Sequence, residues 1–506
     1  MCTNTNLCIV LGIFVVSVIA VIGCNTAAET REPLAVTLDT RGPYLILATR
    51  EAETAYAAAI AAARELHSDA DQLAFDPGNL DDVLDALRRI QPRYALVFIK
   101  PSELDVNFAW RWLTLTTRLD DDSFVDVRTG FITGDSPESA EAFVKRIAAA
   151  VRGEVRLPGK IIDNLGPNTQ AGKHEFHRSP GSFFLSSFAR RLGVETISHG
   201  AEAYAEERPK SMDSAGLLHF GGHGHPDRID DGLNGTQARQ LVLAPCVAFN
   251  GACYTGVTGR WFEQWTDDGR VVERTVAPVD CFCLNLLANQ VLGYLAALHP
   301  DHGIPVYQEM EYLAYSGASL GDVMKHTQDG VVLASGGELP AFEMFSNGSP
   351  SPQWTPSDVM LKGTAARVLF GDPAMVVGEV FVKPPFEVSL EQDESALRVT
   401  AILSNAGLKS TFTDTYHADM AWNPNGFNDR ALITVELPEG WQQVGDVKIL
   451  SVEAGGKPLR FRLVGRGIEH DGGASRLQLQ VDVPTEGYMQ SKLRTIGAKV
   501  ELKVRR

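Results

Sequence analysis

The chain has 506 residues, which at about 150 residues per domain predicts about three domains. With 44% hydrophobic and 22% charged residues, 46 glycines and 26 prolines, the composition is globular and excludes a fibrous, low-complexity or wholly disordered chain. The 63 acidic residues outnumber the 46 basic ones, and the net charge of −17 argues against a nucleic-acid partner, because phosphate-binding surfaces need clustered Lys and Arg.

The amino terminus carries an uncharged apolar run, residues 7–22 (LCIVLGIFVVSVIAVI). The run is shorter than the roughly 20 residues of a membrane-spanning helix and favours a signal-peptide core. It ends in Val21-Ile22-Gly23-Cys24, which resembles the lipobox of bacterial lipoproteins. That resemblance implies a signal peptide over residues 1–24, lipidation of Cys24, and an exported protein anchored to a membrane of the bacterial cell envelope. The alternative is an uncleaved amino-terminal anchor, which also exports the rest of the chain.

Residues 35–165 alternate short apolar runs with helix-favouring stretches. The predicted elements are strand 43–50, helix 52–67, helix 80–90, strand 94–99, helix 104–119, strand 124–132 and helix 137–151. Ser136 and Pro137 open the last helix with a cap oxygen and with a proline whose missing N–H is harmless there. This order is typical of βαβ units, so it predicts a small α/β subdomain with a parallel sheet.

A second α/β subdomain is predicted over residues 166–384. Its predicted elements are helix 181–192, strand 216–220, strand 246–250, helix 283–298, helix 319–334 and strand 366–370. Beyond it, apolar residues recur at every second position in four runs, which begin at Leu397, Ile433, Leu459 and Leu477. Such alternation indicates strands with one buried face and predicts a β-sandwich over residues 385–506.

Two predicted strands end in glycines followed by a reactive side chain. Strand 216–220 leads to His223 and Gly224, and strand 246–250 leads to Cys253. Because the carboxyl ends of neighbouring parallel strands meet at one edge of a sheet, both loops are expected at one site. A thiolate attacks carbonyl groups and an imidazolium protonates a departing amine, so the pair predicts nucleophilic acyl transfer. The amides of Gly224 and Cys253 are expected to form an oxyanion hole, each contributing about 3 kcal/mol.

His223-Gly224 and Ala252-Cys253 resemble the His-Gly and Ala-Cys motifs of the caspase-like clan of cysteine peptidases, in which the chain is most similar to the gingipain family. Residues 315–322 (YSGASLGD) and 369–374 (LFGDPA) resemble further gingipain segments, and the resemblance extends over roughly residues 40–380. It implies a caspase-like parallel-sheet catalytic region in two α/β subdomains, followed by an immunoglobulin-like sandwich. It also implies a cysteine endopeptidase that acts on proteins or peptides without a cofactor.

Other polar residues of the two subdomains are expected to be structural. They are His219 and Cys246, expected in the core, His225 and Asp227, expected in a solvated loop, and the turn at Gly371-Asp372-Pro373. In an exported protein cysteines can pair, and the sequence leaves the pairing of Cys246, Cys281 and Cys283 open.

Two alternatives compete with the peptidase. His223-x-His225-x-Asp227 resembles the first half of the His-x-His-x-Asp-His motif of metallo-β-lactamase-like hydrolases, which predicts a zinc site. Arg228 stands where the last residue of that motif belongs, and a cation there opposes metal binding. The non-enzymatic alternative is a cell-surface adhesion or scaffold protein with an inactive peptidase-like domain.

The gingipain resemblance also raises the questions of specificity and calcium. Gingipains favour basic residues before the scissile bond, which needs an acidic group in a pocket. Asp163, Asp213 and Asp280 lie in plausible loops and are left unassigned. The resemblance also leaves room for a structural calcium ion. The candidate ligand clusters are Asp120-Asp121-Asp122 and Asp267-Asp268.

Overall fold

The computed structural model describes most of the chain beyond the predicted signal peptide. The described residues are 32–159, 161–165, 195–198, 214–229, 233–301, 305–378, 380, 383–393, 395–405, 411–414, 427–441, 444–471, 473–485 and 495–505. Cys24, Asp213 and the predicted helix 181–192 lie outside them. Within these residues, no helix combines the length and the apolar character needed to span a membrane.

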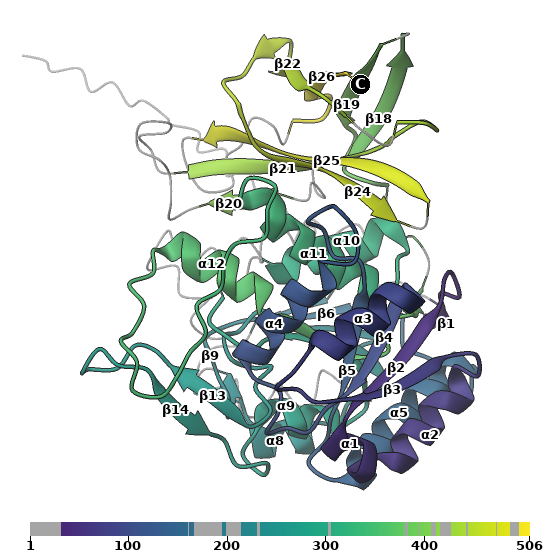
Figure 1. Cartoon of the computed structure of the whole chain (residues 1–506), viewed down its shortest axis with the longest axis vertical. Helices are drawn as coiled ribbons and strands as arrows, with labels where there is room; N and C mark the ends of the chain where they lie inside the picture. Colours follow the sequence, from purple (N-terminus) through teal and green to yellow (C-terminus); the bar gives the residue numbers. More distant parts are fainter. Residues whose placement is uncertain are drawn as a thin grey trace, which may run out of the picture.

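One ten-stranded sheet runs through both predicted α/β subdomains (Figure 1). In spatial order its strands are β3 (Asp71–Phe75), β2 (Tyr44–Thr49), β4 (Tyr94–Phe98), β5 (Arg128–Ile132), β16 (Arg367–Gly371), β15 (Val291–Ala297), β12 (Cys246–Asn250), β8 (Leu217–Phe220), β6 (Ile161–Leu165) and β7 (Glu195–Ser198). The predicted parallel pairing holds on either side of the β15–β16 pair, which is antiparallel. The two halves of the sheet therefore point their carboxyl ends in opposite directions.

Some helices of the α/β region follow the predicted ranges, and three others, at residues 235–240, 305–316 and 356–365, are not predicted by the sequence. The helices are α1 (Arg50–Ala55), α2 (Ala57–Leu66), α3 (Asp81–Ile90), α4 (Val106–Thr116), α5 (Pro137–Val151), α8 (Gly235–Gln240), α9 (Phe282–Leu287), α10 (Pro305–Ser316), α11 (Leu320–Ala334) and α12 (Pro356–Ala365). The Ser136 hydroxyl accepts a hydrogen bond from Ser139 N at 3.1 Å, which confirms the predicted start of α5. The predicted helix 52–67 is divided at Tyr56 into α1 and α2.

The predicted helix 283–298 is wrong. The chain there forms the short α9 and then β15, a central strand in which all residues are buried. The segment is apolar at nearly every position, and an apolar run buried on both faces does not distinguish a helix from a strand by its periodicity. The carboxyl end of this strand lies beside that of β12.

Three small sheets flank the large one. They are formed by β1 (Val36–Leu38) with β17 (Met375–Val377), by β9 (Gly224–His225), β10 (Arg228–Ile229) and β11 (Leu233–Asn234), and by β13 (Arg260–Glu263) with β14 (Val272–Thr275). The sheet of β9, β10 and β11 includes the residues directly after His223, so it fixes the path of the histidine loop.

The carboxyl-terminal region consists of two antiparallel sheets (Figure 1). One contains β18 (Phe386–Gln392), β19 (Ala396–Leu403), β26 (Lys499–Arg505), β22 (Val447–Ala454) and β23 (Lys457–Pro458); the other contains β20 (Thr411–Asp414), β21 (Phe427–Glu436), β25 (Ala474–Thr485) and β24 (Arg462–Asp471). Alternate residues such as Leu397, Val399, Ile433 and Leu479 form a shared buried core, as their period-two spacing predicts. An immunoglobulin-like topology stays a prediction.

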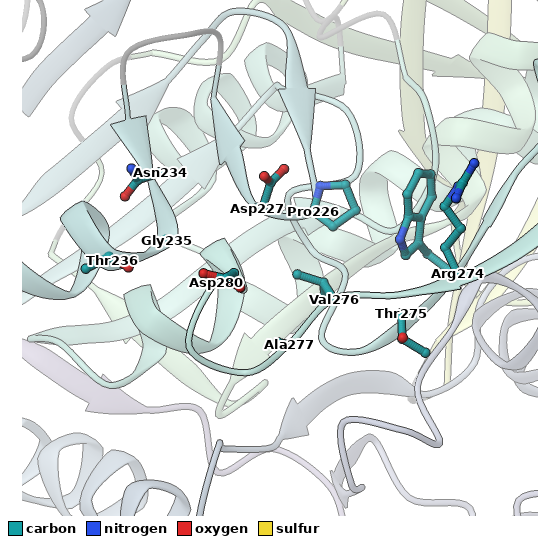
Figure 2. Close-up of a pocket in the computed structure, with 11 residues that line it drawn as sticks. Pro226, Asp227, Asn234, Gly235, Thr236, Arg274, Thr275, Val276, Ala277 and Asp280 are labelled. Atoms are coloured by element: carbon teal, nitrogen blue, oxygen red, sulfur yellow. The ribbon is translucent and has the colours of Figure 1, made fainter.

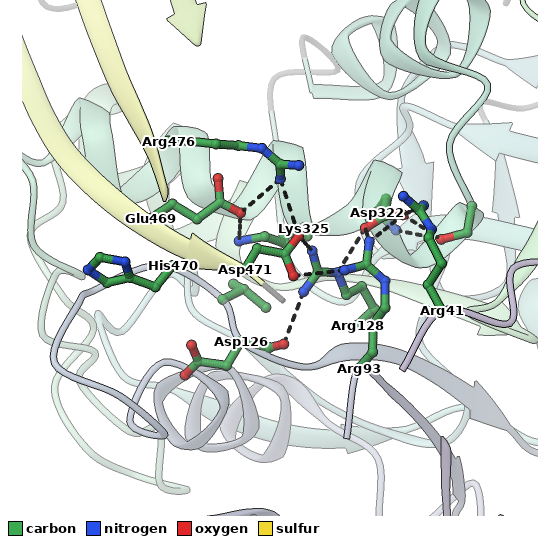
Figure 3. Close-up of polar contacts among 12 residues, drawn as sticks. Arg41, Arg93, Asp126, Arg128, Asp322, Lys325, Glu469, His470, Asp471 and Arg476 are labelled. Carbon is green, nitrogen blue, oxygen red and sulfur yellow. Dashed lines mark hydrogen bonds and ion pairs between the residues drawn. The ribbon is translucent and has the colours of Figure 1, made fainter. Parts of the chain in front are cut away.

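A buried ion network joins the carboxyl-terminal region to the α/β region (Figure 3). Asp471 in β24 binds Arg128 at 2.6 Å and Arg93 at 2.7 Å, and the two arginines share Asp322 of α11 at 2.8 and 3.0 Å. Burial by itself would raise the pKa of Asp471, but the charges of Arg128 and Arg93 outweigh it and hold the pKa well below its usual range. The network therefore stabilises the docking of the two regions.

Asp471→Asn is expected to lower the free energy of unfolding by about 3 kcal/mol at pH 7, because it leaves two buried arginines with only one of their two shared carboxylates, Asp322. A carboxylate with a depressed pKa contributes its full stabilisation above its unfolded pKa of about 3.9 and loses it as the pH falls through the folded value. The difference in the free energy of unfolding between wild type and variant should therefore be constant above about pH 5 and shrink below about pH 4. Denaturant titrations from pH 2 to 7 measure it; a difference that does not depend on pH would contradict this role of Asp471.

Candidate active site

The two predicted reactive loops leave the same edge of the sheet. Strands β8 and β12 are parallel neighbours, and the last residue of β12, Asn250, lies opposite the last residue of β8, Phe220. Gly251 N donates a hydrogen bond to Phe220 O at 2.9 Å, so the pairing continues into the loop that carries Cys253. The predicted adjacency of the two loops is confirmed.

Gly224 brings the histidine loop into direct contact with the cysteine loop. A Cβ atom at Gly224 would lie 2.1 Å from Cys253 O, 2.7 Å from Cys253 N and 2.8 Å from Ala252 C. No side chain fits at those distances, so only glycine allows the two backbones to approach this closely. His223 precedes this contact and is exposed, whereas Gly224 is buried and Cys253 is half-buried.

The cysteine loop is held by a buried chain of hydrogen bonds. The Asn250 side chain accepts from Ala252 N at 2.8 Å and donates to the Tyr294 hydroxyl at 2.9 Å. Tyr294 in turn donates to Thr255 O at 3.0 Å, so β15 supports the loop from beneath. Tyr254, directly after the cysteine, has a φ of 60°, a left-handed conformation that is uncommon for a residue with a side chain. The loop is therefore fixed on both sides of Cys253.

The Cys253 thiol is hydrogen-bonded to a backbone carbonyl and lies in an environment that favours its neutral form. Its Sγ donates a hydrogen bond to Asp301 O at 3.3 Å. Burial raises the pKa of Cys253 to about 12; the negative charge of Asp301 acts in the same direction and the positive charge of Arg367 opposes it. Thiolate formation at neutral pH therefore requires a base that removes the proton.

The rate of Cys253 alkylation by iodoacetamide is expected to rise about tenfold per pH unit from pH 7 to 9, because only the thiolate reacts and its fraction rises tenfold per unit below the pKa. Peptide mass spectrometry after timed labelling assigns the reaction to Cys253. A rate that is already constant above about pH 6 would contradict the protonated resting thiol and indicate a stable imidazolium–thiolate pair.

Sequence reasoning missed His299 and Asp301, which follow β15 at the edge where the two reactive loops lie. His299 is fully buried, and burial lowers its pKa to about 3, so it is neutral. The signal was present as His299-Pro300-Asp301 directly after an apolar run. It was hidden because that run was assigned to a helix, which delivers no residue to the carboxyl edge of a sheet.

Of the residues predicted to be structural, His219, Cys246 and Asp372 are buried, whereas His225 is exposed and Asp227 is partly exposed. His219 is fully buried within β8, as expected. Asp372 in the Gly-Asp-Pro turn is also buried; it binds His67 Nε2 at 2.5 Å and accepts from the Tyr44 hydroxyl at 2.9 Å. Gly371 has a φ of 134°, which only glycine adopts readily. This turn ties β16 to β2 and α2, so its role is structural.

The four cysteines in the described part of the chain are free thiols. Cys246 is buried at the start of β12, as predicted, and Cys283 is buried in α9. Cys281 caps α9 through its sulfur, which accepts from Leu284 N at 3.5 Å. None of the disulfides that the sequence left open is present among these residues.

The zinc motif does not assemble. Asp227 is paired with Arg228 at 3.0 Å, and His225 in β9 lies opposite Arg228 in β10. Among the described residues, the group of three with metal-ligand spacing lies elsewhere and consists of Asp120, Asp122 and Asp126.

The acidic group at residues 120–126 suits a calcium ion by its donor set. Its carboxylate oxygens lie within 4.8 Å of one another, and oxygen is the ligand that calcium prefers. Burial raises the pKa of Asp126 to about 8, and the charge of Asp120 adds to this effect. Asp268 of the second candidate cluster instead binds Thr266 and Arg270 N within a turn. Calcium stays a prediction.

A cavity of about 400 Å³ lies beside the histidine loop (Figure 2). It is lined by Pro226, Asp227, Asn234, Gly235, Thr236, Trp261, Arg274, Thr275, Val276, Ala277 and Asp280. The Trp261 ring lies 5.0 Å from the ring of Tyr254, which follows the cysteine, so the cavity adjoins both reactive loops. Asp280 is thus the one of the three candidate specificity residues that the structure places in a cavity wall.

Solved structures similar to this fold include a protease, the Arg-specific cysteine proteinase gingipain R and a separase–securin complex. The complex of the pro- and mature domains of Porphyromonas gingivalis RgpB is 10% identical, with a TM-score of 0.45 over 91% of this chain and 99% of that chain. The Arg-specific cysteine proteinase gingipain R is 10% identical, with a TM-score of 0.45 over 92% and 99%. The separase–securin complex of Saccharomyces cerevisiae is 11% identical, with a TM-score of 0.33 over 57% and 16%.

With TM-scores below 0.5, these likenesses carry no argument about the chemistry of this chain. No protein-family model and no curated protein matches it.

Proposed function

We propose that the protein is a cysteine endopeptidase in which Cys253 is the nucleophile and His223 the acid and base. The observation that carries the proposal is the packing of Gly224 against the Ala252–Cys253 peptide, because it joins the two loops at the residues next to both reactive groups. The same proposal includes export and a lipid anchor at Cys24, which rest on the sequence. Mass spectrometry that finds an intact, unmodified Met1 terminus would contradict the anchor.

The proposed reaction has two halves. The Cys253 thiol leaves Asp301 O, passes its proton to His223, and its sulfur forms a bond to the scissile carbonyl carbon. The amides of Gly224 and Cys253 donate to the resulting oxyanion, each lowering the barrier by about 3 kcal/mol. His223 then protonates the departing amine as the C–N bond breaks. Water, deprotonated by His223, hydrolyses the thioester and restores the thiol.

The cavity beside the histidine loop is proposed to hold a substrate side chain. Two of its charged residues are compensated, since Asp227 pairs with Arg228 and Arg274 with Glu263. Within the described residues, Asp280 has no such ion pair, so the wall keeps one uncompensated negative charge. A basic side chain complements that charge.

A positional-scanning peptide library tests function and pocket together. The wild type should cleave next to basic residues. Asp280→Asn should lower kcat/KM for those peptides about tenfold. The control, Asp227→Asn, removes a charge that Arg228 already compensates and should change the preference for basic residues little. Cleavage should be lost with iodoacetamide and persist with a chelator of zinc. Loss with the chelator alone would favour the zinc hydrolase, and a wild type that cleaves nothing would favour the inactive scaffold.

A further inference from the structure

A fully buried arginine lies beneath the cysteine loop. Arg367 is the first residue of β16 and has no exposed surface. It pairs with Ala297, the last residue of β15, and the two strands are antiparallel. The start of β16 is therefore at the carboxyl end of β15, on the edge of the sheet from which the Cys253 loop also leaves.

The guanidinium of Arg367 binds three separate segments of the chain. It holds Glu309 of α10 with two parallel bonds, Nε to Oε1 at 2.5 Å and Nη2 to Oε2 at 2.7 Å. Its Nη1 donates to Asp301 Oδ2 at 2.7 Å, in the loop after β15, and to Asn250 O at 3.0 Å, at the end of β12. The side chains of Arg367, Asp301 and Glu309 are completely buried.

Two of these segments determine where the Cys253 sulfur lies. Asn250 is the residue from which the cysteine loop starts, and its side chain also binds Ala252 N. Asp301 provides the carbonyl that accepts the hydrogen bond of the thiol. The Arg367 guanidinium thus holds both the residue from which the cysteine loop starts, Asn250, and the residue whose carbonyl accepts the hydrogen bond of the thiol, Asp301.

We propose that Arg367 is a positioning residue of the peptidase, which holds the Cys253 loop in register with the loop after β15. The inference rests on the proposed role of Cys253. The planar guanidinium donates in a fixed fork to four acceptor oxygens on three segments, one more than the three N–H groups of a lysine ammonium could serve. Two buried carboxylates around one cation are also a weak source of stability, because desolvation offsets their attraction. The arrangement is therefore better explained by geometry than by stability.

Arg367 also acts on the charge of the thiol. The charges of Asp301, in the loop after β15, and of Arg367, in β16, act on the pKa of Cys253 in opposite directions. Glu309 of α10 shares the guanidinium and adds a second negative charge to the cluster. Removal of the cation should hinder thiolate formation, and removal of the Glu309 charge should favour it.

Alkylation of Cys253 by iodoacetamide as a function of pH tests this inference without any substrate. In Arg367→Gln the profile should move to higher pH by about one unit, so that labelling is about tenfold slower at each pH. In Glu309→Gln labelling should be faster than in the wild type, a shift of opposite sign that keeps the test valid if Arg367→Gln does not fold. An unchanged profile in the folded variants would overturn the role of Arg367.

Arg367→Lys keeps the positive charge but loses the guanidinium geometry, so it separates the effect of position from the effect of charge. Arg367→Lys should keep the alkylation profile near that of the wild type but lower kcat about 100-fold with little change in KM, because a displaced nucleophile is costly. The control is Arg128→Lys, which alters an arginine buried to a similar degree between two carboxylates, away from the site. It should lower the thermal midpoint while kcat and labelling stay unchanged.

A wild-type kcat in Arg367→Lys, or an equal loss in Arg128→Lys, would overturn the positioning role. A wild type without peptidase activity would instead reject the proposed function, and the alkylation profiles would still decide the effect of Arg367 on Cys253.

Discussion

Cys253→Ala is expected to reduce peptide cleavage by about 10⁵-fold or more, because loss of the nucleophile removes the covalent route altogether. The thermal midpoint should change little, since the substitution removes one sulfur and its hydrogen bond to Asp301 O, worth about 1 kcal/mol. Initial rates on a cleaved peptide and a thermal melt of the same preparation measure both quantities.

The matched control for this variant is Cys246→Ala. Cys246 is a second free thiol on the same segment of chain, seven residues before Cys253. It is buried at the start of β12, and burial raises its pKa to about 12. Its truncation should lower the stability by about 1 to 2 kcal/mol and leave turnover per folded molecule unchanged. Full cleavage by Cys253→Ala, or an equal loss in both variants, would reject Cys253 as the nucleophile.

Gly224→Ala is expected to lower kcat/KM by at least about 100-fold, because the added methyl group overlaps the Cys253 carbonyl and must push the two loops apart. The Cβ would lie 2.1 Å from a backbone oxygen, which cannot move aside as a flexible side chain can. A destabilisation of about 1 to 3 kcal/mol should accompany the loss, as for other overpacked sites.

Gly216→Ala is the control for steric disruption on the same strand. A Cβ at Gly216 would lie 1.9 Å from Pro158 O, but this glycine precedes β8 and lies at the opposite edge of the sheet from the site. It should destabilise the protein to a similar degree while activity per folded molecule persists. Equal activity losses in the two glycine variants would show that the Gly224 contact has no special role in the site.

The local features of the fold were predictable because each depends on neighbouring residues. Ser136 and Pro137 marked the start of α5. The apolar runs that became β4 and β12 were short and continuous, the first preceded by Arg93 and the second bounded by Pro245 and Gly251. The glycines before His223 and Cys253 indicated loops at strand ends. Neighbouring parallel strands end at the same edge of a sheet, and this rule was enough to predict that the two loops lie together.

The remaining features depend on contacts between distant segments, and no local pattern reports them. The strand β15 was hidden in an apolar run that suits a buried helix equally well. Arg367 is a single basic residue at the start of an apolar strand, and only the fold brings it to Asp301 and Glu309. The antiparallel junction of β15 and β16 likewise follows from chain topology.

The central claim is that the Cys253 sulfur and the His223 imidazole act on the same carbonyl group, and a peptidyl chloromethyl ketone that matches the cleaved sequence tests it most directly. We expect one adduct per molecule, located on Cys253 by peptide mass spectrometry, and labelling at least about 100-fold slower in His223→Ala. An adduct on another residue, or equal labelling of Cys253 with and without the imidazole, would contradict the account.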